Sequence, residues 1–177
     1  KADGSFDVNY SIVVQNTGDQ TLNQLTLVDD LTQANQLAGA FNGVVSAPLV
    51  SLNNASGNSQ APSSNGGAYD GSNGLLTGTD GVLAVGDSYT VSFVVNVDPN
   101  ANNAPSNFNA LATATGTDAA NNTVSDDTDS GVDPSNNPGG NGTPTPITPP
   151  ASNAQIGAAM AAQVGSIQAD GSFNVSY

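Results

Sequence analysis

Near its start the chain reads Phe6-Asp-Val-Asn-Tyr-Ser-Ile-Val-Val14, in which apolar and polar side chains alternate as far as Ile12. Successive side chains of a β-strand point to opposite faces, so the pattern predicts a strand over 5–15 with one buried face. The same alternation returns in Tyr89-Thr-Val-Ser-Phe-Val-Val-Asn-Val97. These two stretches decide the fold class, which we expect to be all-β.

The ten residues that open the chain return at its end. The first copy is Lys1-Ala-Asp-Gly-Ser-Phe-Asp-Val-Asn-Tyr10, and the second is Gln168-Ala-Asp-Gly-Ser-Phe-Asn-Val-Ser-Tyr177, identical at seven of ten positions. The copies lie 167 residues apart, and a repeat of this length predicts a tandem array of structural units. We therefore expect one full period followed by the first strands of the next.

Shorter alternating stretches predict further strands, separated by turns rich in Gly, Asn and Asp. Residues 31–43 fit either a short helical turn or a loop, and 53–74 are expected to form a long loop. The further strands are expected at 25–29, 44–52, 75–76, 82–83, 108–116 and 123–129.

The sequence divides into three parts. Residues 1–133 are expected to form a β-sandwich that lacks its own first strand. The Pro/Gly/Asn-rich stretch 134–152 is expected to form a semi-rigid linker. Residues 153–177 are expected to form the first strands of the next repeat. Within them the alternation from Ile156 to Val164 predicts a strand over 155–165, although its alanines also fit a helix. In a complete domain we expect the strand equivalent to 155–165 to precede Lys1 and to pair with the strand 5–15. The domain boundary is therefore expected near residue 150. Without that preceding strand, the edge of the sheet beside 5–15 is left open.

The composition excludes several kinds of chemistry. The chain has 15 acidic residues, all Asp, one basic residue, no His and no Cys, and its net charge is −14. Disulfides, thiolate nucleophiles and imidazole bases are therefore excluded, and we expect no enzyme. Nucleic acid is not an expected partner, because phosphates are bound by Lys and Arg. Membrane insertion is not expected either, since no apolar run approaches about 20 residues.

Several motifs carry a resemblance that covers almost the whole chain in order. They are Ala169-Asp-Gly-Ser-Phe173, Tyr10-Ser-Ile-Val-Val-Gln-Asn-Thr-Gly-Asp19, Tyr69-Asp-Gly71, Leu83-Ala-Val-Gly86 and Ser125-Asp-Asp-Thr-Asp-Ser-Gly131. With these motifs the chain resembles the conserved-repeat, immunoglobulin-like domains of prokaryotic giant surface adhesins and extracellular filament proteins. The resemblance implies an immunoglobulin-like β-sandwich at the bacterial cell surface. It also implies a role as an extender, with binding left to other domains.

Calcium is the expected cofactor, if the protein has one. Asp127, Asp129 and Asp133 share parity in the densest acidic stretch, and Asp29 and Asp30 end another predicted strand. Calcium takes about 6–8 oxygen ligands, and carboxylates supply them. The alternative is a solvated acidic edge, because no complete calcium motif is present.

Three functions remain open. The first is a structural extender in an adhesin or filament, whose partners are adjacent identical repeats joined through residues 155–177. The second is a separate subunit that polymerises by donating the same residues to a neighbour. The third is a module that binds surface glycans through the loop 53–74, where Tyr69 is the one tyrosine expected to be exposed; Tyr10 and Tyr89 are expected in the core.

Overall fold

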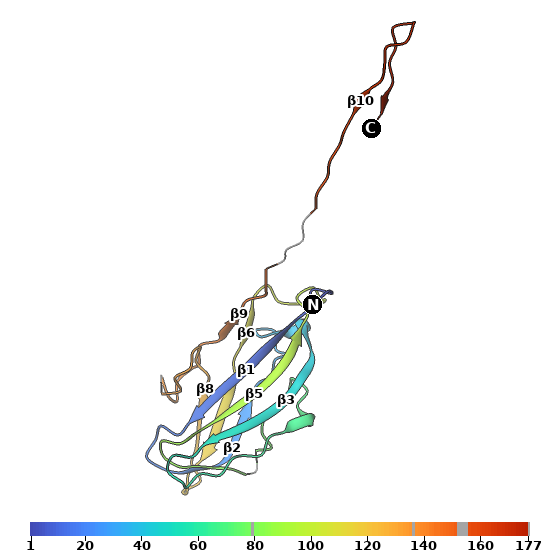
Figure 1. Ribbon diagram of the computed structural model, residues 1–177. Helices are drawn as coiled ribbons and strands as arrows, with labels where there is room; N and C mark the ends of the chain where they lie inside the picture. The colour runs from blue at the N-terminus through green and yellow to red at the C-terminus, as the bar shows by residue number, and fades with distance from the viewer. Residues whose placement is uncertain (79, 136, 152–155, 177) are drawn as a thin grey trace.

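Two antiparallel sheets form the body of the protein, which is known from a computed structural model that describes residues 1–78, 80–135, 137–151 and 156–176 (Figure 1). The first sheet has the order β1-β5-β3, with β1 (Phe6–Gln15), β5 (Ser88–Val97) and β3 (Phe41–Asn53). The second has the order β4-β2-β7-β8, with β4 (Val82–Leu83), β2 (Leu22–Val28), β7 (Thr113–Thr117) and β8 (Thr123–Asp127). Two 3-10 turns, η1 (Ala38–Ala40) and η2 (Gly66–Ala68), interrupt the loops. The all-β sandwich predicted from the alternation is confirmed.

The central strand of the first sheet is β5, and it supplies the most deeply buried row of side chains. Its partner β1 runs antiparallel to it, with Tyr10 opposite Phe93 and the pairing unbroken from Phe6 to Gln15. The rings of Tyr10 and Phe93 stack with their centroids 4.7 Å apart. The residues of β5 that face the core are Tyr89, Val91, Phe93, Val95 and Val97, all buried.

The second sheet closes the core from the other side. Leu25 and Leu27 of β2 are buried, as is Ala114 of β7. Each fully buried Leu or Val contributes roughly 1.5–3 kcal/mol of hydrophobic stabilisation. The sandwich therefore depends on apolar burial and main-chain ladders, as expected for a chain without cysteine.

The edge strand β3 is irregular. Its register against β5 shifts three times between Phe41 and Leu49, and Pro48 lies within it. Proline has no N–H to donate, so it is tolerated in β3, whose second edge has no partner strand among the described residues. This strand is longer than the 44–52 predicted from the sequence.

Buried polar side chains hold the turns at one end of the sandwich. Asn16 donates to the carbonyls of Gln20 and Leu83 at 2.7 and 2.8 Å. Asp87 accepts hydrogen bonds from the hydroxyls of Ser56 and Ser59, which ties the loop after β3 to the start of β5. These side-chain hydrogen bonds lower the pKa of Asp87.

Two expected strands differ in the structure. The stretch 108–116 is divided into β6 (Phe108–Ala110) and β7, because β6 pairs with β9 (Thr145–Ile147) while β7 pairs within the second sheet. β9 lies inside the stretch 134–152 that was expected to be a linker. Residues 75–76 form no strand, and Leu76 makes only an isolated bridge with Ser64.

The C-terminal segment, described over 156–176, lies away from the sandwich (Figure 1). It contains only a two-residue ladder between β10 (Gln163–Val164) and β11 (Val175–Ser176), so the predicted strand over 155–165 is present only at its end. Within the described part of the chain, none of the helices has the length and apolar character needed to span a bilayer.

Candidate functional site: a groove beside strand β1

An open groove of about 540 Å³ runs along the free edge of β1. Residues 8–15 of β1 form one wall. The other wall and the floor come from Asp29 and from residues within 110–114, 126–134 and 145–147. The groove therefore lies where the first sheet ends and the chain after β8 passes the second sheet.

The edge of β1 is unpaired among the described strands, because β5 is its one neighbour in the sheet. An edge strand offers a row of free N–H and C=O groups to any added strand. The side chains on its core face are also incompletely covered: Tyr10 is 8% exposed, while Val8, Ile12 and Val14 pack against the core but remain only partly buried. The corresponding residues of β5 are fully buried, so the missing cover lies on the groove side of β1.

Three buried polar groups that line the groove have no hydrogen-bond partner among the described residues. They are the hydroxyl of Tyr10, Oδ1 of Asp29 and Oδ1 of Asp126, and Asp29 is only 1% exposed. Burial raises the pKa of Asp29 to about 7, and the nearby charge of Asp30 adds to the effect. Burial also raises the pKa of Tyr10. The floor of the groove thus holds a carboxyl group that is protonated over much of the acidic range.

Three of the predicted calcium ligands use their carboxylates in hydrogen bonds to three separate partners. Asp127 accepts from the hydroxyl of Thr113 at 2.6 Å, and Asp129 accepts from the backbone N–H of Thr143 at 2.9 Å. Asp133 accepts from both the N–H and the hydroxyl of Ser135. Asp129 and Asp133 both line the groove, but neither directs its carboxylate to a shared centre with Asp127.

The other two predicted ligands are separated by burial. Asp29 lies in the groove floor, whereas Asp30 accepts from Thr32 and Gln33 at the surface. Across the residues that the structure describes, no group of three or more Asp, Glu, His or Cys is placed to hold a metal ion. Calcium binding stays a prediction that a titration with calcium and chelator tests.

The expectation that Tyr69 is exposed is wrong. Its side chain is buried, its hydroxyl donates to the carbonyl of Asp29 at 2.9 Å, and its ring packs edge-on against Phe93. The loop folds inward here because the Tyr69 ring fills the space between the two sheets. The placement of Tyr10 and Tyr89 in the core is confirmed.

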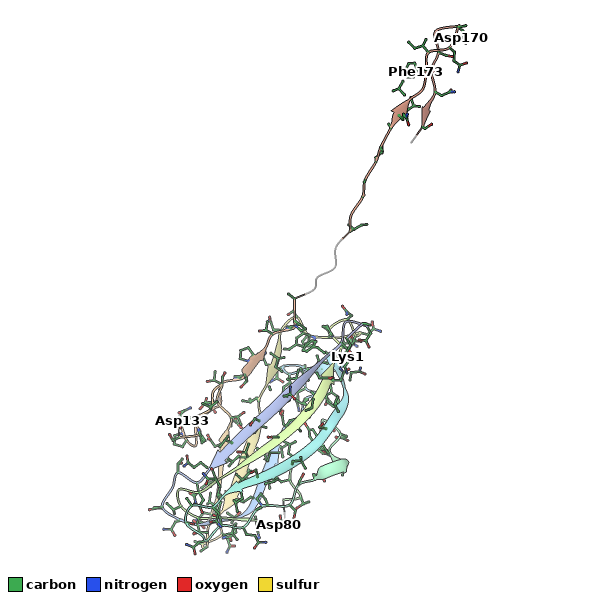
Figure 2. The ribbon with its side chains drawn as sticks, viewed as in Figure 1. Lys1, Asp80, Asp133, Asp170 and Phe173 are labelled. Carbon is green, nitrogen blue, oxygen red and sulfur yellow. The ribbon has the colours of Figure 1, made fainter. Side chains whose placement is uncertain are left out.

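The repeated sequence forms the same turn in both of its copies. In the first, the N–H and hydroxyl of Ser5 donate to Oδ1 of Asp3 at 3.0 and 2.8 Å. In the second, Ser172 donates to Asp170 at 3.0 and 2.7 Å. The glycine between them has a positive φ in each copy, +87° for Gly4 and +83° at the second. The second copy is therefore a structural equivalent of the first, although Figure 2 shows Asp170 and Phe173 far from Lys1.

The residues before the second turn present an uncovered apolar row. Ile156 is 98% exposed and Met160 is 84% exposed, and Val164 is exposed as well. Ala158 and Ala162 lie between them and are also exposed. An isolated apolar side chain at a surface needs no explanation, but a row at every second position is typical of a strand that lacks its sheet.

Sequence reasoning expected an open edge at 5–15 but missed the groove's other wall. Residues 145–147 line it, although the prolines of the stretch 134–152 indicated a linker, and Asp29 was expected at the end of a strand. The only available signal for Asp29 was its place directly after the apolar strand residues Leu25, Leu27 and Val28.

Comparison with protein-family models finds no match for this chain. No curated protein and no solved structure matches it either.

Proposed function

We propose that this protein is a structural extender repeat of a bacterial extracellular adhesin or surface filament, and that it acts without catalysis. The observation that carries the proposal is the second copy of the opening turn, which has the same hydrogen bonds as the first and lies away from the sandwich. A second copy of a domain's first elements, displaced along the chain, is what a tandem array of sandwiches requires.

The segment between the sandwich and the second copy supports this function. It carries Pro149 and Pro150 directly before Ala151, and proline restricts the backbone to extended conformations. A connection of this kind keeps neighbouring domains apart at a defined spacing. The net charge of −14 adds repulsion between neighbours, which also favours an extended array.

Chains of one, two and three periods test the function by small-angle X-ray scattering. We expect the maximum dimension to grow by a constant increment of at least about 33 Å for each added period, the length of a ten-residue strand. Replacing Pro149 and Pro150 by Gly in the three-period chain should shorten the particle, because glycine makes the connection flexible. A three-period chain no longer than the two-period chain would refute the extender function.

Polymerisation of separate subunits is the second candidate function. The observation that favours it is the exposed apolar row between 156 and 164, which is free to enter the groove of another molecule. Polymerisation predicts the same local structure at each junction as the tandem array. The two functions differ in whether the strand that enters the groove comes from the same chain or from a separate subunit, and crosslinking distinguishes these two cases.

A further inference from the structure

We propose that residues 156–164 of the preceding period fill the groove beside β1 in one fixed register, with Val164 opposite Val8 and Met160 opposite Ile12. The inference rests on the proposed function and adds to it the occupant of the groove, the direction of the added strand and the residue pairs. The added strand is antiparallel to β1 and extends the first sheet to the order of added strand, β1, β5 and β3.

The register follows from the hairpin that the segment already forms. Gln163 pairs with Ser176 and Val164 pairs with Val175. With the 167-residue offset, Val175 is equivalent to Val8 and Ser176 to Asn9. The hairpin β10–β11 therefore shows the first two pairs of the ladder that the preceding period makes with β1. Continued along β1, the same register places Ala162 opposite Tyr10 and Ala158 opposite Val14.

The faces of the two strands agree in this register. Directly opposite residues of an antiparallel pair lie on the same side of the sheet. Val8, Tyr10, Ile12 and Val14 face the core, so their partners face the core too, and these partners are the exposed apolar row. A shift by one residue would instead turn Gln163 inward and the apolar row outward. Hydrophobic burial thus selects the register that the hairpin shows.

Side-chain size fits the groove as well. The small Ala162 lies opposite the large Tyr10 ring, which stacks on Phe93. The flexible Met160 lies opposite Ile12, whose side chain is only partly covered. Docking removes from water both the exposed apolar row and the partly buried side chains of β1.

The chain's own segment is already paired with the residues that follow it. Gln163 and Val164 pair with Ser176 and Val175, which are equivalent to Asn9 and Val8 of the next period. To enter its own groove in this register the segment would have to run back along β1, because Ile156 lies next to the end of β1 and the chain leaves the sandwich at the end where β1 begins (Figure 1). The occupant of the groove therefore comes from the preceding period.

Engineered disulfides test the register, since the natural chain contains no cysteine to compete. The substitutions Ala161→Cys and Ser11→Cys place thiols on the outer face of an in-register pair. The matched control replaces Gln15 instead of Ser11, on the same face but about 13 Å further along. A disulfide bridges Cα atoms only up to about 7 Å apart, so the control is out of reach.

Two samples are oxidised and analysed by non-reducing electrophoresis and peptide mass mapping. One is a two-period chain with Ala161→Cys in its first period and Ser11→Cys in its second; the other is a mixture of separate 177-residue chains, each with one of the two substitutions. We expect the in-register link to form in the two-period chain, and the Gln15→Cys control to form none. Equal linkage with the control, or no linkage at all, overturns the register.

A link found only between separate chains overturns the preceding period as the source and assigns the groove to another subunit. The proposed extender function is tested independently, by the small-angle X-ray scattering experiment. If the maximum dimension grows by a constant increment but the in-register disulfide does not form, the extender function is retained and the register is refuted. If the disulfide forms but the maximum dimension does not grow, the register is retained and the extender function is refuted.

Discussion

A re-registered chain, in which residues 151–167 precede residues 1–150, will unfold at a temperature roughly 6–12 °C higher than the present chain. In the re-registered chain the strand 156–164 comes before β1 and is joined to it through the turn that Asp3 and Ser5 form. Burial of Ile156, Met160 and Val164, burial of the partly covered face of β1 and the new hydrogen-bond ladder together offset the cost of ordering the strand, and we expect a net gain of about 3 kcal/mol. Each kcal/mol corresponds to about 2–4 °C for a domain of this size.

Two substitutions in the re-registered chain separate groove filling from other effects. Met160→Asp puts a carboxylate on the core face near Asp29 and should abolish the gain. Gln163→Asp adds the same charge on the outer face and should leave most of it. Thermal melting followed by circular dichroism, with calcium and with chelator, measures both. Equal melting temperatures of the re-registered and present chains would contradict the account, and a rise with calcium alone would support the predicted metal site.

The second large effect concerns the buried carboxyl of Asp29. Replacement by Asn keeps the shape of the side chain and removes its ionisation. We expect Asp29→Asn to be more stable than the natural chain at pH 8, with the difference shrinking as the pH falls toward 4. The size of the change between these pH values is on the order of 4 kcal/mol, because the pKa is raised from 3.8 to about 7.

The sign follows from the proton balance. A carboxyl whose pKa is higher in the folded state keeps its proton between pH 3.8 and about 7, while the unfolded chain has lost it. The folded state then binds more protons, so the free energy of unfolding falls as the pH rises through this window. The free energy of unfolding of the Asp29→Asn variant does not fall for this reason, because its side chain does not ionise. Denaturant unfolding of both chains at several pH values measures it.

Asp30→Asn is the matched control for this measurement. Asp30 is adjacent and loses the same charge, but it lies at the surface, where the hydrogen bond from Thr32 lowers its pKa. Its replacement should not reproduce the gain at high pH. A pH-independent difference between Asp29→Asn and the natural chain would show that Asp29 is not buried in its neutral form.

Local sequence predicted the strands whose one face is buried. The alternation in β1 and β5 depends only on burial of every second residue, and both strands appear where expected. The partners of strands could not be read in this way. The pairing of β1 with β5 joins residues about 80 positions apart, and β9 forms in a proline-rich stretch because β6 lies beside it. Such pairings depend on how distant parts of the chain pack together, so a short stretch of sequence does not predict them.

The candidate site was predicted in part for the same reason. The repeat and the alternation of 156–164 indicated an open edge beside 5–15, and the structure has an unpaired edge and a groove there. The parity of Asp127, Asp129 and Asp133 failed to place them together, because parity relates side chains only while the strand continues, and β8 ends at Asp127. The burial of Asp29 and Tyr69 depends on packing between the sheets.

Amide hydrogen exchange of β1 tests the central claim most directly, which is that the preceding period completes the sandwich. In an edge strand every second N–H points away from the sheet and exchanges readily, while the others are protected by β5. We predict that in the second period of a two-period chain, these outward amides between Val8 and Val14 become protected as strongly as their neighbours. The same alternating exchange in both periods would contradict the account.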